Sequence, residues 1–159
     1  MNRQSSAIKE LNRLACQRQR ELHPDVPVAY LPPHRYLDHS ANGLTRCVLA
    51  WLKLNGHQAE RISVTGRRID QRQTYTDVLG QRRQVGTVKW IASSMQRGSA
   101  DISAIIKGIP VKIEIKFGED RQSDSQRTYQ AEVERAGGVY VMVGTFQEFL
   151  DWYQQKFGK

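Results

Sequence analysis

Cysteine and long hydrophobic stretches are both scarce in this chain. Its 159 residues include two cysteines, Cys16 and Cys47, without the paired spacing of a zinc site or the density of a disulfide scaffold. No hydrophobic run is long enough to cross a bilayer, and residues 1–20 are too polar for a signal peptide. These absences argue against a disulfide-stabilised secreted module and a membrane protein. They predict a cytoplasmic protein with reduced thiols and no membrane partner.

Acidic residues are also in the minority. Sixteen Asp and Glu stand against 24 Lys and Arg, which gives a net charge of +8 and an isoelectric point near 9.8. Such an excess suits a polyanionic partner, of which nucleic acid is the commonest. A merely basic protein without such a partner has the same composition, so charge alone does not decide. The length fits one domain with a proper core.

The N-terminal third predicts two helices joined by an extended connector. Residues 5–22 carry a thin apolar stripe, and residues 44–56 repeat apolar side chains at helical spacing before a glycine. Four prolines make residues 23–40 an extended connector. We therefore expect a helix and connector over 1–39 and the main domain over 40–159. Whether the first helix packs on that domain is left open.

The remaining chain predicts an α/β fold with one mixed sheet covered by helices. Strands are expected over 57–65 and 85–93 around a polar insert, 66–84, followed by two strands within 98–117. A helix is expected over 125–136, and the apolar run 139–143 is typical of a buried central strand. A last helix begins at Phe146, where Thr145 and Glu148 form a capping-box pattern.

The two strands within 98–117 carry the candidate chemistry. Apolar residues alternate with Lys112, Glu114 and Lys116 over residues 111–117, so Glu114 and Lys116 share one sheet face. Lys107-Gly108 supplies the turn that returns the chain antiparallel and brings Asp101 close to that face. The alternative is an ordinary surface sheet face with Lys–Glu pairs.

Carboxylates and an amine on one face suit metal-dependent phosphodiester hydrolysis. Asp101 and Glu114 are hard oxygen ligands for Mg²⁺ or Mn²⁺, and the backbone carbonyl of Ile115 is a further candidate ligand. Lys116 is placed to orient water or to stabilise a pentacoordinate phosphate. Gln126 and Gln130, one helical turn apart on the following helix, are candidates to bind phosphate or orient Lys116, or else solvated surface residues.

The pattern Gly98-x-x-Asp101, Ile113-Glu114-Ile115-Lys116, Ser123-x-x-Gln126 and Gly137-Gly138 resembles the PD-(D/E)XK nuclease superfamily. The nearest branch is the VRR-NUC and Holliday-junction-resolvase-like group. The resemblance covers roughly residues 40–153 and implies a restriction-endonuclease-like core, αβββαβ. It implies Mg²⁺-dependent cleavage of DNA, including branched or structured DNA, by Asp101, Glu114 and Lys116 with support from Gln126.

Two departures from the family pattern bear on this function. Ala100 stands where the name-giving proline often sits, which is a common variation. The family's first helix usually offers a glutamate toward the metal, whereas residues 40–44 here contain no carboxylate and Asn42 is at most a weak ligand. The alternative function is therefore a catalytically silent nucleic-acid-binding module on the same fold.

Basic residues concentrate in the region 61–97, with Tyr75 and Trp90 among them, and two aspartates oppose them. This density predicts a DNA-binding surface with salt-dependent affinity. Its members are Arg61, Arg67, Arg68, Arg72, Arg82, Arg83, Lys89 and Arg97. The alternatives are an ordinary solvated hairpin and a DNA-binding N-terminal helix. An RNA-directed or nucleotide-directed hydrolase and a homodimer both remain open.

Overall fold

The computed structural model describes residues 5–63, 66–92 and 96–158. The chain divides into two compact units. The core unit comprises Met1–Ile62 and Gly98–Lys159, and the hairpin unit comprises Ser63–Arg97. We describe each unit by itself.

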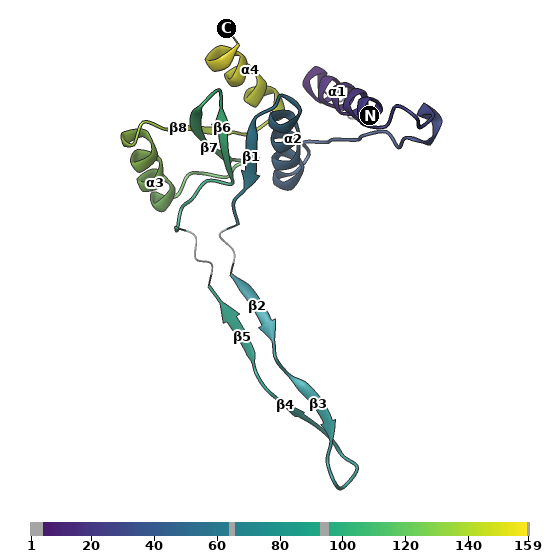
Figure 1. Cartoon of the computed structure of the whole chain (residues 1–159). Coiled ribbons are helices and arrows are strands. Elements are labelled where there is room, and N and C mark those ends of the chain that lie inside the picture. The colour runs from purple at the N-terminus through teal and green to yellow at the C-terminus, as the bar shows by residue number, and fades with distance from the viewer. Residues whose placement is uncertain (1–4, 64–65, 93–95, 159) are drawn as a thin grey trace. The chain divides into compact units, whose positions relative to one another are not determined.

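A four-stranded mixed sheet organises the core unit (Figure 1). The strands are β1 (Gln58–Arg61), β6 (Ile102–Ile106), β7 (Ile109–Ile115) and β8 (Val139–Val143), in the order β1-β6-β7-β8. The pairs β1–β6 and β6–β7 are antiparallel and β7–β8 is parallel. The expected mixed α/β architecture is therefore confirmed, with β7 as an inner strand.

Two expectations about strand position are wrong. β8 lies at an edge of the sheet, and its Met142 is 45% exposed, although its apolar run predicted a central strand. The region 85–93 contributes nothing to this sheet among its described residues, because β5 (Val88–Ile91) pairs within the hairpin unit. Apolar content and alternation indicate a strand but do not name its partner.

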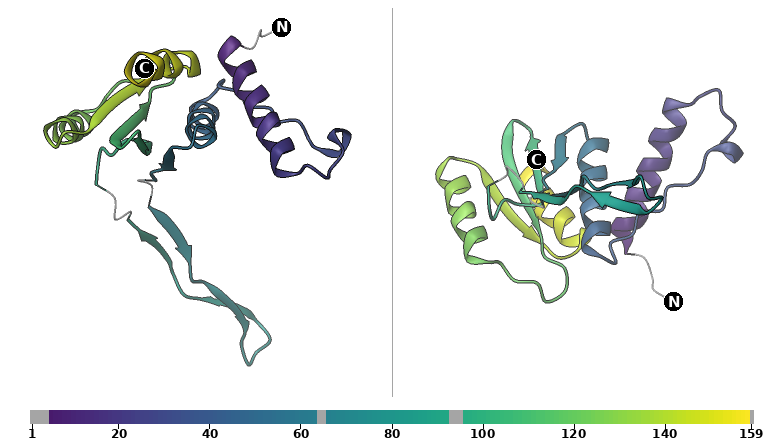
Figure 2. Two further views of the ribbon diagram at one scale, coloured as in Figure 1. Left: turned by 45° about the horizontal axis from the view of Figure 1, so that its top comes forward. Right: turned by 90° about the horizontal axis from the view of Figure 1, so that it is seen from below.

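Three helices build the main core with one face of the sheet. They are α1 (Ser6–Leu22), α2 (Ala41–Leu54) and α4 (Phe146–Phe157), and a short 3-10 helix (Val28–Tyr30) lies in the proline-rich connector. The strand residues Val111, Ile113 and Ile115 pack with them in one apolar cluster. The helix α3 (Asp124–Arg135) lies beside β8, and α1 lies on the far side of α2 from α3 (Figure 2).

The first helix belongs to this core. Ile8 and Leu11 of α1 are 1% and 0% exposed and join the apolar cluster formed by α2, α4 and the sheet. The two compact units meet at residues 62/63 and 97/98. The expected boundary at 39/40 stays a prediction. Leu22, the last residue of the helix expected over 5–22, is 59% exposed and does not join this core.

The hairpin unit consists of two short antiparallel ribbons in succession. β2 (Arg67–Asp70) pairs with β5, and β3 (Gln73–Thr76) pairs with β4 (Arg82–Val85). Gly86 joins β4 to β5 with a positive φ, and a Cβ there would lie 2.3 Å from the carbonyl oxygen of Gln71. Nearly every described side chain of this unit is exposed, so the unit has no apolar core of its own.

No helix in the described residues is both long enough and apolar enough to span a membrane.

The start of α4 differs in detail from the expected capping box. Thr145 caps the Glu148 N–H at 3.2 Å, but the Glu148 carboxylate accepts from the Gly144 N–H at 2.8 Å. The Glu148 carboxylate therefore binds the N–H group one residue before the N-cap Thr145 and not that of Thr145 itself.

Candidate active site

The turn between β6 and β7 aligns the two candidate carboxylates. Lys107 and Gly108 both adopt positive φ, 49° and 81°, which gives the tight two-residue connection expected from the sequence. The register then pairs Ile102 with Ile113, so Asp101 comes beside the end of β7. There its Oδ2 accepts a hydrogen bond from the Ile115 N–H at 2.9 Å.

A glycine allows the chain that leads to Asp101 to pack closely against α3. Gly98 has φ of 85°, and a Cβ there would lie 2.4 Å from the Ser125 carbonyl oxygen. No L side chain fits this space without displacing the first turn of α3. The spacing Gly98-x-x-Asp101 therefore reflects close packing of the chain on α3, just before Asp101 meets β7.

Glu114 is a buried carboxylate, at 3% exposure, and not part of a solvated sheet face. Its Oε1 accepts a short hydrogen bond from Gln126 Nε2 and lies 3.2 Å from Lys116 Nζ. Its Oε2 is buried with no hydrogen-bond partner in the described part of the chain. A buried, unpartnered carboxylate oxygen is costly, so it normally binds a proton or a cation.

Gln126 holds the site together through the N-terminal cap of α3. Ser123 and Gln126 form a capping box, in which Gln126 Oε1 accepts from the Ser123 N–H at 2.9 Å. The same Oε1 accepts from Lys116 Nζ at 3.0 Å, while Nε2 donates to Glu114. Reversing the amide would set its NH₂ against two donors, so the network defines its orientation.

Lys116 is 13% exposed and its ammonium group is held from several sides. Besides Glu114 and Gln126, it lies 3.3 Å from Asp120 Oδ2 and donates to the Arg121 carbonyl oxygen at 3.1 Å. Glu114 and Lys116, at the end of β7, thus form one polar cluster with Gln126 of α3. A shallow depression of about 460 Å³ adjoins Lys116, Asp120 and Glu148.

Burial, reinforced by the nearby charge of Asp101, raises the pKa of Glu114 despite the opposing effect of Lys116. A carboxyl whose pKa is raised on folding contributes stability below its unfolded pKa and loses it as pH rises through the folded pKa. In EDTA, Glu114→Gln should therefore unfold at a higher temperature than wild type at pH 8, with the difference shrinking toward pH 4. Thermal unfolding across this range measures it, and a variant less stable than wild type at pH 8 would contradict it.

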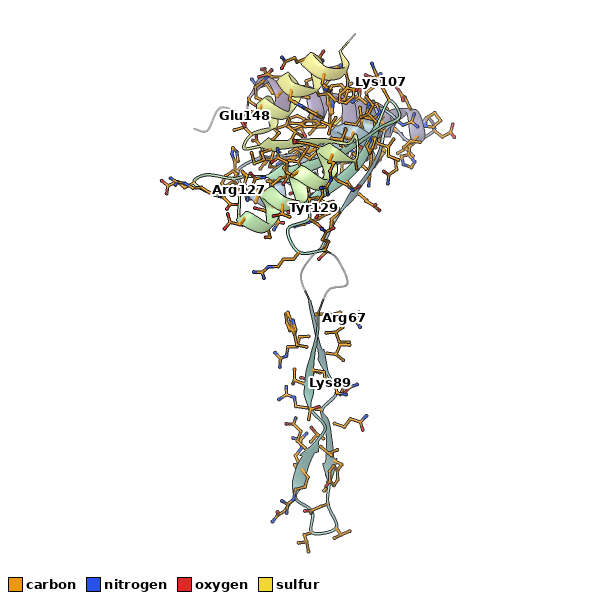
Figure 3. All side chains as sticks on the ribbon, turned by 90° about the vertical axis from the view of Figure 1, so that its left-hand side faces the viewer. Arg67, Lys89, Lys107, Arg127, Tyr129 and Glu148 are labelled. Atoms are coloured by element: carbon orange, nitrogen blue, oxygen red, sulfur yellow. The ribbon has the colours of Figure 1, made fainter. Side chains whose placement is uncertain are left out.

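Tyr140 of β8 is a neighbour of the site that the sequence did not reveal. Its hydroxyl is buried without a well-formed hydrogen bond, but it lies close enough to Glu114 and Gln122 to interact with both side chains. Burial, followed by the Glu114 charge, raises the pKa of Tyr140. The Tyr140 ring makes an edge contact with Tyr129 of α3, at 6.4 Å between centroids. The side chains labelled on α3 in Figure 3 include Tyr129. The signal was weak, because Tyr140 reads as one more residue of an apolar run.

Two expected auxiliary residues lie in other contacts. Gln130 binds Gln122 and Glu134, at 2.7 and 2.8 Å, and makes no hydrogen bond to Lys116 or Glu114. Asn42 at the start of α2 accepts a hydrogen bond from Arg61 at 2.7 Å. The Ile115 backbone contacts the Asp101 carboxylate through its N–H, while metal ligation by its carbonyl stays a prediction.

The basic residues of the hairpin unit differ in how far their charge is neutralised. Arg72 pairs with Asp70 at 2.6 Å and Arg83 pairs with Asp77 at 2.9 Å, while Arg68 lies 3.9 Å from Asp70. Three basic residues are exposed and form no ion pair within residues 66–92: Arg67, Arg82 and Lys89. Arg67 and Lys89 are labelled in Figure 3. Arg97 is also exposed, and Arg61 belongs to β1 of the core unit.

The carboxylates fit a magnesium ion in charge and chemistry. Asp101 and Glu114 are close enough for their charges to interact, and Glu114 Oε2 is buried without a partner. No group of three or more His, Cys, Asp or Glu side chains suited to a metal occurs among the described residues. Two carboxylates still suffice for Mg²⁺, which keeps several waters and uses substrate oxygens as ligands.

Comparisons with known proteins give no significant match to a family model, to a curated protein or to a solved structure.

Proposed function

We propose that this protein is a metal-dependent endonuclease that hydrolyses DNA phosphodiester bonds, with Mg²⁺ or Mn²⁺ as cofactor. The observation that carries the proposal is the Glu114 carboxylate. It is 3% exposed, one oxygen is held by Gln126 and Lys116, and the other has no partner in the described chain. A carboxylate held this way, beside Asp101, supports cation binding next to a fixed ammonium group. The resemblance to PD-(D/E)XK nucleases supports the same function.

Each residue has a separable role in this proposal. Asp101 and Glu114 would hold the metal ion, with the Ile115 carbonyl as a third protein ligand. Lys116 presents a positive charge and hydrogen-bond donors to the phosphate or the attacking water. Gln126 is a positioning residue, because it fixes Glu114 and Lys116 through one amide. The chemistry supplied by the metal is Lewis-acid activation of the phosphodiester and neutralisation of developing charge.

The test is incubation of the purified protein with duplex, forked and four-way-junction DNA, in Mg²⁺ and in EDTA. Cleavage products that require Mg²⁺ support the proposal, and the preferred substrate shows whether branched DNA is favoured. A single-stranded RNA of the same sequence tests the RNA-directed alternative. Binding without cleavage on every DNA, in both Mg²⁺ and Mn²⁺, would overturn the nuclease proposal.

A catalytically silent DNA-binding module is the second candidate function. One observation favours it: Asn42, at the start of the helix where the family usually offers a glutamate, accepts a hydrogen bond from Arg61. The position therefore adds no negative charge to the site. The cleavage assay separates the two functions, since only the nuclease forms Mg²⁺-dependent products.

The exposed basic residues of the hairpin unit should determine how strongly DNA binding depends on salt. Replacing Arg67, Arg82 and Lys89 with alanine should weaken binding to all sequences and flatten the slope of log K against log salt by up to about 0.9 per lost phosphate contact. Fluorescence anisotropy at several salt concentrations measures this slope.

The matched control removes the same charge from α1. Lys9, Arg18 and Arg20 are exposed there, and Arg18 is paired with Glu21 at 3.1 Å. The control triple alanine variant should keep the wild-type slope. If instead it loses the slope and the hairpin variant keeps it, DNA binding belongs to α1.

A further inference from the structure

The turn at the end of the hairpin unit displays two bare aliphatic side chains. Val78 and Leu79 are 102% and 78% exposed, more than any other described large hydrophobic residues except Tyr30. They lie between β3 and β4 in the loop that closes the ribbon (Figure 1). Together they form a small apolar surface at adjacent positions that a partner can contact.

The turn that carries them is closed by hydrogen bonds. Asp77 Oδ1 accepts hydrogen bonds from the N–H groups of Leu79 and Gln81, at 3.0 and 2.9 Å, and Oδ2 pairs with Arg83. Backbone hydrogen bonds from Asp77 N to Gln81 O and from Gly80 N to Asp77 O close the loop. These hydrogen bonds define the backbone conformation at Val78 and Leu79, which lowers the backbone entropy lost on binding.

The ribbon behind this turn is basic. Residues 66–92 contain six Lys and Arg and two aspartates, and both aspartates are paired with arginines. The three unpaired basic residues, Arg67, Arg82 and Lys89, sit on the strands that lead to the turn. An isolated two-stranded ribbon is only marginally stable in water. The charge of the ribbon points to a polyanionic partner, and a bound partner would also stabilise a ribbon that has no core.

We propose that Val78 and Leu79 form a wedge that inserts between neighbouring base pairs of duplex DNA while the basic strands hold the phosphates. This inference rests on DNA being the partner of the proposed function. Aliphatic side chains inserted at a base step unstack it and kink the duplex. The arrangement supplies both requirements, an apolar tip on a hydrogen-bonded turn and positive charge along the strands behind it.

Two other partners could contact Val78 and Leu79, but the charge of the ribbon or the small apolar area disfavours them. A second copy of the chain would bring two positively charged ribbons together, which repel. An anionic membrane surface would attract the ribbon, but two aliphatic residues bury little apolar area there. Both are outcomes of the test below.

A wedge predicts a preference for DNA that is already easy to unstack. Inserting into an intact stack costs the free energy of unstacking that base step, and a mismatch or nick removes part of that cost. Wild type should therefore bind a duplex with a central mismatch about tenfold or more tighter than the matched duplex. This property would direct the protein to distorted DNA regardless of base sequence.

The experiment compares wild type with Val78→Ser/Leu79→Ser in EDTA, so that no cleavage occurs. The duplex carries 2-aminopurine, whose fluorescence rises when the base unstacks. The control is Val85→Ser/Ile91→Ser, which removes two aliphatic side chains, 58% and 52% exposed, from the strands of the same ribbon. Wild type and control should raise the fluorescence and prefer the mismatch, whereas the tip variant should lose both and keep the salt slope.

Other outcomes would overturn the wedge. These are a tip variant that unstacks DNA like wild type, a wild type that binds DNA without any fluorescence rise, or a tip variant altered only in sedimentation or in binding to phosphatidylserine vesicles. A change in sedimentation alone would assign the tip to self-association, and a change in vesicle binding alone would assign it to a membrane surface. Because the readout needs no metal, failure of the wedge is distinguishable from failure of nuclease activity, which is measured by Mg²⁺-dependent products.

Discussion

Glu114→Gln and Lys116→Ala should each reduce DNA cleavage by roughly a hundredfold or more, as loss of a group acting in the transition state commonly does. The Gln substitution keeps the shape of Glu114 but removes the charge needed to hold a cation. The Lys116 substitution removes the only side-chain ammonium within salt-bridge distance of Glu114 among the described residues. DNA affinity should change little in both variants, because phosphate contacts elsewhere dominate it. Initial cleavage rates at saturating DNA, alongside anisotropy in EDTA, measure the two effects separately.

Matched controls exist close to the site. Lys112 lies on the same strand as Glu114 and donates to Ser103 at 2.7 Å, and the exposed Glu119 directly precedes Asp120. Lys112→Ala and Glu119→Gln should cleave nearly as fast as wild type. If Glu114→Gln and Lys116→Ala also cleave like wild type, the chemistry does not belong to this hairpin.

Leu11→Ala should destabilise the core unit by about 2–5 kcal/mol, the usual range for a large buried side chain cut back to alanine. Leu11 is fully buried in the cluster shared by α1, α2, α4 and the sheet. The matched control Leu22→Ala, on the same helix at 59% exposure, should change stability by less than about 0.5 kcal/mol. Chemical denaturation of the three proteins gives these differences.

Equal stability of Leu11→Ala and wild type would mean that α1 does not pack on the core unit. The expected result has a practical consequence for locating the DNA-binding surface. Deleting residues 1–22 would expose the core that α1 covers, so a truncation cannot separate lost DNA contacts from lost folding. Charge substitutions on exposed positions of α1 avoid this difficulty.

Local patterns in the sequence predicted the elements that depend on neighbouring residues alone. Apolar spacing located α1, α2 and α4, and alternation with the Lys107-Gly108 turn located β6 and β7. These signals work because helix and strand periodicity, caps and tight turns are decided within a few residues. The candidate pair Glu114 and Lys116 on one face followed from the same local rule.

Long-range pairing could not be predicted in the same way. The strand expected over 85–93 exists in part as β5, but its partner is β2 of the hairpin unit, and the apolar run of β8 lies at the sheet edge. A period of two indicates an extended segment and leaves open which edge it joins. The ion pairs that neutralise Arg72 and Arg83 likewise depend on contacts that composition does not specify.

For the candidate site, the sequence by itself determined the residue types, their order and the shared face of Glu114 and Lys116. Only the tertiary structure decided the environment that gives them chemistry. It buries Glu114, leaves its Oε2 without a partner in the described chain, and brings Gln126 from α3 to bind both Glu114 and Lys116. The physical reason is that burial and hydrogen bonding of a side chain depend on what packs over its face of the sheet. Here that is set by α3, which brings in Gln126, ten residues after Lys116 and part of the capping box that Ser123 begins.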